Sequence, residues 1–221
     1  MNKTAKSIIL NMLIASAGLF TFGFGVYLTI QANLGAAPWD VFELGLSGTF
    51  GIKYGTAAIL VSLTVLCIDV ALKEKIGIGM FLDAFIVGKT VDLFNSINLV
   101  PAIDSPLIGA AVMISGLIIM GFSQYLYMKA ALGCGPRDTM LVGFSRKLPK
   151  IPIGVVSIGI MTIVAGIGWL LGGPLGVGTL ICAFLAGPIM QFAFRVTKFN
   201  ATQVSHQGLK ESFEVFAGKN C

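Results

Sequence analysis

Six long apolar runs divide the chain, and each is close to the length that an α-helix needs to cross a bilayer. The hydrocarbon core is roughly 30 Å thick and a helix rises ~1.5 Å per residue, so about 20 apolar residues make one crossing. Two further helix-like stretches, 38–50 and 136–148, are too short and too polar to span. The six predicted spans are residues 8–30, 55–72, 76–100, 107–128, 151–171 and 175–194.

Composition strengthens this prediction. The 221 residues are 56% hydrophobic and 11% charged, and the mean hydropathy is +0.90. In soluble domains about 25% of the residues are charged. The sequence therefore argues against a water-soluble domain and predicts an all-α polytopic membrane protein.

Charge predicts the orientation of the spans. With the amino terminus in the cytoplasm, 13 of the 15 Lys and Arg residues, Arg137 among them, lie on the inner side; Lys53 is outside and Lys89 lies within a span. Short cytoplasmic loops carry such an excess of basic residues. We therefore expect a cell (inner) membrane protein with both termini in the cytoplasm. The net charge of +5 follows from the same bias and from attraction to anionic lipid, so we expect no nucleic-acid partner.

An internal repeat covers both halves of the chain. Shifted by 98 residues, the segment from Gly18 to Ser47 matches the segment from Gly116 to Ser145 at 13 of 30 positions. With a shift of 99 the match continues through the paired glycines Gly55 and Gly154. Each copy reads as a span, a short helix and two more spans.

Three crossings per copy is an odd number, so the second copy enters the membrane from the opposite face. The predicted fold is thus two inverted three-helix repeats, each with a short interrupted or re-entrant helix after its first span. Inverted repeats with interrupted helices recur in secondary transporters, where the site lies near the midplane. The expected divisions are residues 1–100, 101–199 and a cytoplasmic polar tail, 200–221.

The motif LGxxPxD occurs once in each copy. Glycine permits a sharp turn after a span, and proline suits the first turn of a new helix. The short helix then either lies flat at the headgroups or re-enters the bundle; the sequence favours re-entry. Free amides at its start favour an anionic or polar group, whereas the acids favour a proton or cation, and the sequence leaves this open. The motif residues are Leu34, Gly35, Pro38 and Asp40, and Leu132, Gly133, Pro136 and Asp138.

Other polar residues near the motif are candidates for the same site. Arg137 corresponds to Trp39 and Cys134 to Ala36, so the copies differ chemically at one structural place. The alternative for Arg137 is a position in the positive inner loop. Tyr27 and its equivalent Tyr125 precede the motif by one to two turns.

The third span carries Asp83, Lys89 and Asp92. A charge near the bilayer centre costs at least ~2.5–3.5 kcal/mol, so such residues normally face the bundle interior and pair. Lys89 and Asp92 are three residues apart and are expected to form an ion pair on one helix face. A functional role and a purely structural one both stay open for these residues.

Cysteine and histidine usage argues against metal or catalytic chemistry. The four cysteines, Cys67, Cys134, Cys182 and Cys221, form no CxxC pair, and His206 in the polar tail is the single histidine. We expect no disulfide scaffold, no metal site, no cofactor and no enzymatic activity.

Three segments carry a family likeness: VYLTIQANLGAAPWDVFELGLS, IGIGMFLDAFIVGKTVDLF and GVGTLICAFLAGPIMQF. They resemble the YczE-like branch of the YczE/YyaS/YitT bacterial integral membrane proteins. The similarity runs from about Leu13 to Phe194, and LGxxPWD is its most specific part. The resemblance implies a bacterial membrane location and transfers no catalytic residue and no substrate.

The leading hypothesis is a small-solute transporter or permease with its site between the copies. The alternative is a non-transporting accessory or regulatory protein of an envelope or biosynthetic complex, which needs no polar cavity. The expected partners are the lipid bilayer and a small polar or anionic solute. The predicted site residues are Tyr27, Asp40, Lys89, Asp92, Tyr125, Cys134, Arg137 and Asp138.

Overall fold

The computed structural model describes residues 5–200 and 208–209, and within them the chain forms eight α-helices and no strand. The predicted polar tail, 200–221, lies almost wholly outside the described residues. The helices are α1 (Ala5–Gln31), α2 (Pro38–Phe50), α3 (Tyr54–Leu72), α4 (Ile78–Ser96), α5 (Pro106–Lys129), α6 (Pro136–Lys147), α7 (Ile153–Leu170) and α8 (Val177–Val196).

Five of these helices, α1, α3, α5, α7 and α8, are long and apolar enough to cross a membrane. The chain is thus a helical membrane protein of the polytopic kind, as predicted. The sixth predicted span corresponds to α4, which has 19 residues but carries Asp83, Lys89 and Asp92. Large apolar side chains are exposed on all the long helices, which suits a surface that faces lipid.

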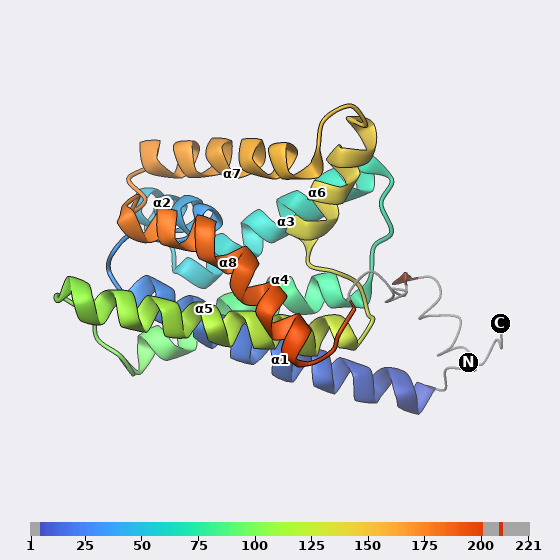
Figure 1. Cartoon of the computed structure of the whole chain (residues 1–221), viewed down its shortest axis with the longest axis horizontal. Coiled ribbons are helices and arrows are strands. Elements are labelled where there is room, and N and C mark those ends of the chain that lie inside the picture. The colour runs from blue at the N-terminus through green and yellow to red at the C-terminus, as the bar shows by residue number, and fades with distance from the viewer. Residues whose placement is uncertain (1–4, 201–207, 210–221) are drawn as a thin grey trace.

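Helices α1 and α5 pack extensively on each other along one face of the bundle and run side by side in opposite directions (Figure 1). Gly18 of α1 lies against Tyr127, whereas Gly25, two turns later, lies against Gly116. A Cβ atom on Gly25 would stand 2.8 Å from the Gly116 carbonyl oxygen, so the missing side chain lets the backbones touch. Such small-residue contacts are typical of helix pairs in membranes.

The remaining contacts follow the repeat. The first copy packs α4 on α1 as the second packs α8 on α5. Across the copies, α2 packs on α7 as α6 packs on α3. One difference stands out, because α3 packs extensively on α4 while no comparable interface joins α7 to α8. The copies therefore contact each other through α1 and α5, α2 and α7, and α3 and α6, and they do not form separate compact units.

Two equivalent glycines make the breaks before the short helices. Gly35 has a φ of 104° and Gly133 a φ of 121°, in the region that favours glycine. Next to them, the Leu34 carbonyl accepts a hydrogen bond of 2.7 Å from the Gly178 amide, and the Leu132 carbonyl accepts one of 2.9 Å from Gly79. Each break is thereby tied to the last helix of the other copy.

The short helices begin inside the bundle. Each has proline in its first turn, where the missing amide proton costs nothing. Pro136 is fully buried, and Pro38, Asp40 and Val41 are buried in the first turn of α2. The Arg137 guanidinium carbon lies 5.0 Å from the centre of the Trp39 ring. Two equivalent positions of the repeat therefore touch each other where the short helices start.

One predicted boundary is wrong. The third apolar run was expected to remain helical to residue 100, but α4 ends at Ser96 and Asn98 turns with a φ of 47°. Val100 instead binds Tyr27: its amide donates to the Tyr27 hydroxyl at 2.8 Å and its carbonyl accepts from it at 2.7 Å. The buried hydroxyl thus satisfies the backbone just after the helix end.

The glycine at the break has a direct test. We expect Gly35→Ala to lower the free energy of unfolding by ~1–3 kcal/mol, because a side chain is strained at this φ. Its Cβ would also approach the Gly176 amide nitrogen to 2.6 Å. Thermal unfolding of the purified protein in detergent measures the loss.

Gly159→Ala is the matched control, since Gly159 lies inside α7 and a Cβ there meets nothing within 4 Å. This change should leave stability unaltered or raise it by up to ~1 kcal/mol through helix propensity. Equal destabilisation by both substitutions would contradict the role given to the break.

Candidate functional site

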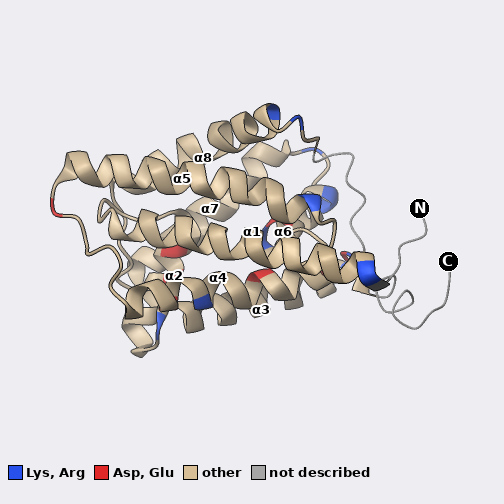
Figure 2. Cartoon of the chain, turned by 90° about the horizontal axis from the view of Figure 1, so that it is seen from below, with Lys and Arg blue, Asp and Glu red and all other residues tan. Residues whose placement is uncertain are grey.

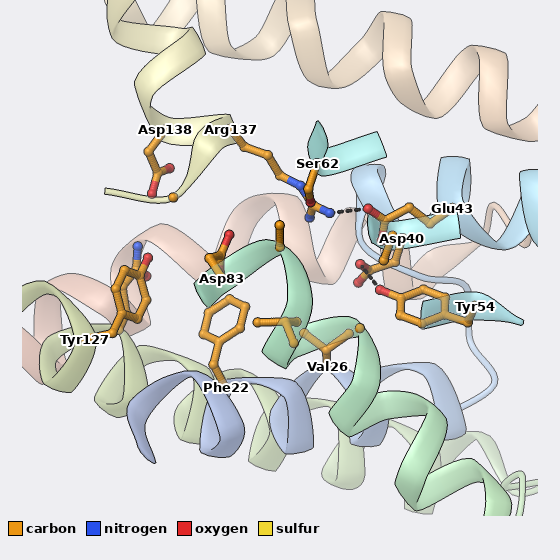
Figure 3. Close-up of a pocket in the computed structure, with 16 residues that line it drawn as sticks. Phe22, Val26, Asp40, Glu43, Tyr54, Ser62, Asp83, Tyr127, Arg137 and Asp138 are labelled. Atoms are coloured by element: carbon orange, nitrogen blue, oxygen red, sulfur yellow. Dashed lines mark hydrogen bonds and ion pairs between the residues drawn. The ribbon is translucent and has the colours of Figure 1, made fainter. Parts of the chain in front are cut away.

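A polar cavity of about 120 Å³ lies where the short helices begin (Figure 3). Six helices contribute to its wall, four from the first copy and α5 and α6 from the second. Its apolar floor is formed by Phe22 and Val26 of α1. The polar residues of the wall are Asp40, Glu43, Tyr54, Ser62, Asp83, Gln124, Tyr127, Arg137 and Asp138.

An ion pair joins the two copies across this cavity. Asp40 and Glu43 are three residues apart on α2, so both project from one helix face. Asp40 accepts a hydrogen bond of 2.9 Å from the Tyr54 hydroxyl. Arg137, in the first turn of α6, donates to Glu43 Oε1. The side chain of Glu43 is 0% exposed, and its other oxygen, Oε2, receives no hydrogen bond.

Two further acids lie on the opposite side of Arg137 (Figure 3). Asp83 comes from α4 and Asp138 from α6, and Gly135 lies between them. A Cβ atom on Gly135 would stand 3.2 Å from Asp83 Oδ2 and 3.9 Å from Asp138 Oδ2. The missing side chain therefore leaves both carboxylates room at the start of α6.

The cavity holds four carboxyl groups, on Asp40, Glu43, Asp83 and Asp138, and one guanidinium. Asp40 and Glu43 are buried, Asp83 is half-buried and Asp138 is exposed. Arg137 neutralises one negative charge, and a second ionised carboxylate in the buried pair costs several kcal/mol unless a proton or a cation joins it. The site is suited to hold protons or a cationic group among its carboxylates.

A larger hollow of about 330 Å³ adjoins the cavity. Asp138 lines both spaces, and Cys134, Thr139 and Arg146 line only the larger one. The predicted site residue Cys134 is thus placed next to the acidic cavity rather than in it.

Three of the eight predicted site residues line the cavity itself: Asp40, Arg137 and Asp138. Arg137 was counted among the inner-loop charges, but its guanidinium points into the bundle toward Glu43. The structure therefore favours the site over the positive loop for this residue.

The other predicted residues lie elsewhere. Tyr27 binds the backbone of Val100. Its equivalent in the second copy, Tyr125, stacks edge-on against Phe199 and accepts a hydrogen bond from Lys129. Neither tyrosine contributes to the cavity wall.

The expected ion pair between Lys89 and Asp92 does not form, although both residues are described in the structure. Lys89 is exposed. Asp92 Oδ1 instead accepts a hydrogen bond of 2.8 Å from the amide of Gly55, in the first turn of α3. The helix start is the reason, because its free amides favour a carboxylate.

Sequence analysis missed Glu43, and it left Asp83 out of the predicted site. Glu43 has no acidic counterpart in the second copy, where Leu141 occupies the equivalent position, so the repeat did not point to it. A usable signal was present, since an acid three residues after Asp40 falls on the same face of a short helix. Among the described residues, no group of three or more His, Cys, Asp or Glu side chains is arranged to hold a metal ion.

Comparison with known proteins places the chain in a family. A model for a family of unknown function, DUF6198, matches residues 9–195. The chain belongs to this family. The predicted likeness to YczE-like proteins is confirmed by the relatives below.

Three relatives cover most of the chain. It is 32% identical over 179 residues to the uncharacterized membrane protein YczE of Bacillus subtilis, covering 80% of this chain and 82% of the relative. An uncharacterized protein of Haemophilus influenzae is 30% identical over 179 residues, covering 80% of each chain. The uncharacterized protein YyaS of Bacillus subtilis is 29% identical over 180 residues, covering 78% of this chain and 87% of the relative. No solved structure matches the chain.

The ion pair across the copies predicts a strong asymmetry between single and double substitutions. We expect Arg137→Leu to destabilise the protein by ~3–5 kcal/mol, because it leaves Glu43 buried and unpaired. Adding Glu43→Leu should recover most of this loss, since leucine occupies the equivalent position of the second copy. Chemical unfolding in detergent micelles measures both values.

Arg195→Leu serves as the control, because Arg195 is an exposed residue in the last turn of α8. Substitution of such a surface residue changes the free energy of unfolding by about 0.5 kcal/mol or less. A double variant no more stable than Arg137→Leu would refute the interpretation of the buried pair.

Proposed function

We propose that the protein is a small-solute transporter of the bacterial cell membrane, with its site in the acidic cavity between the two copies. The observation that carries this proposal is the Arg137–Glu43 pair, which joins the two short helices across a charge-rich cavity. Charged residues inside a membrane bundle are costly, and they usually mark ion or substrate pathways. Transporters built from repeats place their sites at such broken helices.

The proposal includes a topology of six spans in two inverted repeats, with α4 as the sixth span. Asp83 faces the cavity and Asp92 binds the start of α3, so two of the three charges of α4 have partners or a polar setting inside the bundle. The opposite directions of α1 and α5 support the inversion. In this topology α2 and α6 are re-entrant, each leaving by the face from which the chain entered.

We further propose that both termini are cytoplasmic. Figure 2 shows Lys and Arg concentrated in the half of the bundle where α1 begins, as the positive-inside rule requires for a cytoplasmic end. The large hollow that contains Cys134 and Arg146 then opens on the cytoplasmic side.

The charge of the cavity supports a particular solute class. Three more carboxyl groups than guanidinium groups favour a cationic solute, or a proton exchanged for a solute, over the anionic solute that helix amino termini alone would favour. The proposal contains no catalytic step, no cofactor and no nucleic-acid partner. In this proposal the cavity residues bind the solute or proton, neutralise its charge and release it.

Cysteine accessibility tests the topology. In a variant without its four native cysteines, Lys53→Cys should react with an impermeant maleimide in intact cells, and Lys147→Cys only after permeabilisation. Both lysines are exposed, so accessibility depends on the side of the membrane alone. Labelling of both positions from the same side would exclude the inverted arrangement.

Transport by the purified protein in liposomes tests the function. We expect saturable uptake of small amines such as methylammonium, with a change in internal pH where a proton is exchanged. Glu43→Gln and Asp83→Asn should each lower uptake by about tenfold or more, since a hydrogen bond to a charged group contributes ~1.5–3 kcal/mol.

Asp104→Asn is the matched control, because Asp104 is an exposed acid in the connection between α4 and α5. Its uptake should equal that of the unmodified protein. If amines, sugars, amino acids and organic anions all fail to exceed the flux into empty liposomes, the transporter proposal is wrong and an accessory function becomes the better account.

A further inference from the structure

An apolar groove of about 580 Å³ lies beside the acidic cavity. Helices α2, α3, α6 and α7 form its walls, and among the described residues that line it Thr64 alone carries a hydroxyl group. The groove exists because α3 and α7, equivalent helices of the two copies, do not pack extensively on each other. In a membrane protein, a hollow of this kind faces hydrocarbon rather than water.

The dimensions of the groove suit one alkyl chain. Along α3 the lining runs from Ala57 to Ile68, which at ~1.5 Å per residue is about 17 Å. One leaflet contributes about half of the roughly 30 Å hydrocarbon core. The groove therefore has the length of a single acyl chain, and it lies along the middle of α3.

The groove and the acidic cavity meet at one pair of side chains. Trp39 lines the groove, Arg137 lines the cavity, and both also line a third pocket of about 40 Å³. The guanidinium carbon lies 5.0 Å from the ring centre of Trp39, a cation–π contact. Helix α3 separates the groove from the cavity, because Val61 lines the groove and the next residue, Ser62, lines the cavity.

We propose that the site takes an amphiphile, a single-chain alkylamine-like molecule whose tail lies in the groove and whose ammonium group passes the Trp39–Arg137 pair to reach Glu43. The buried oxygen Glu43 Oε2, which receives no hydrogen bond, is the acceptor for the ammonium group. The net negative charge of the cavity attracts that head, and the apolar groove removes the tail from water. This inference rests on the proposed function, because it names the solute class of the same site.

Tryptophan fluorescence measures occupancy directly. The chain has two tryptophans, so Trp169→Phe leaves Trp39 as the single reporter. In phosphatidylcholine vesicles, ω-bromoundecylamine should quench Trp39 saturably. Excess dodecylamine should relieve the quenching, whereas dodecanol, which lacks the charge, and butylamine, which lacks the chain, should each compete at least about tenfold less well, a difference of ~1.4 kcal/mol.

Matched variants distinguish binding in the groove from partition into the bilayer. Thr64→Phe fills the groove and should weaken quenching about tenfold or more, a loss of ~1.4 kcal/mol or greater, while Cys67→Phe, exposed and outside the groove lining, should not. Glu43→Gln should abolish the preference for dodecylamine over dodecanol. In the opposite variant, Trp39→Phe, the remaining tryptophan is Trp169, which is 60% exposed at the end of α7. Quenching of Trp169 therefore measures partition of the amine into the lipid alone.

Equal competition by dodecanol and dodecylamine, or quenching of Trp39 as unsaturable as that of Trp169, would overturn the proposal and leave the groove as a place for bilayer lipid. Small-amine uptake surviving that result would keep the transporter proposal intact. Selective, saturable quenching without any flux would support the amphiphile site and remove the transporter proposal instead.

Discussion

The ion pair between Arg137 and Glu43 is the interaction on which the arrangement of the two copies depends. Desolvating two charges costs several kcal/mol per ion, and their attraction offsets this only while they stay together. The pair fastens α6 to α2 and keeps the first turns of both short helices inside the bundle. If a conformational change separates Arg137 from Glu43, each charge needs another partner. Asp83 and Asp138 line the same cavity and are the acids available to Arg137, whereas a proton or a bound cation must neutralise Glu43.

Backbone hydrogen bonds also hold the starts of the two short helices in place. Non-helical backbone at membrane depth is tolerated only where protein or a cavity satisfies it. The break before α2 meets this need through the bond from Gly178 to Leu34, and the break before α6 through the bond from Gly79 to Leu132. Because each bond crosses to the other copy, neither copy can hold its short helix alone. The side chains of the acidic cavity are therefore positioned by a scaffold that is nearly symmetric.

The sequence predicted the helices to within a few residues, because glycine, proline and polar turns interrupt otherwise apolar runs. It did not predict how each helix is rotated, since a span with apolar residues all around carries no periodic signal. Tyr27 and Tyr125 are equivalent in the repeat, yet one is buried against Val100 and the other meets Phe199. Glu43 went unnoticed for a different reason, because it has no acidic counterpart in the second copy.

The absence of an acidic counterpart to Glu43 in the second copy matters for the proposed mechanism. Exchanging the roles of the two copies would put Leu141 where Glu43 stands and Trp39 where Arg137 stands, so an apolar contact would replace the ion pair. The observed arrangement and the exchanged one proposed for transport would thus differ in the charge they bury. A ligand that neutralises Glu43 lowers the cost of releasing Arg137, and it therefore shifts the balance between them. If the proposed transport function holds, this difference in charge between the two copies gives a bound solute a means to drive the conformational change that transport requires.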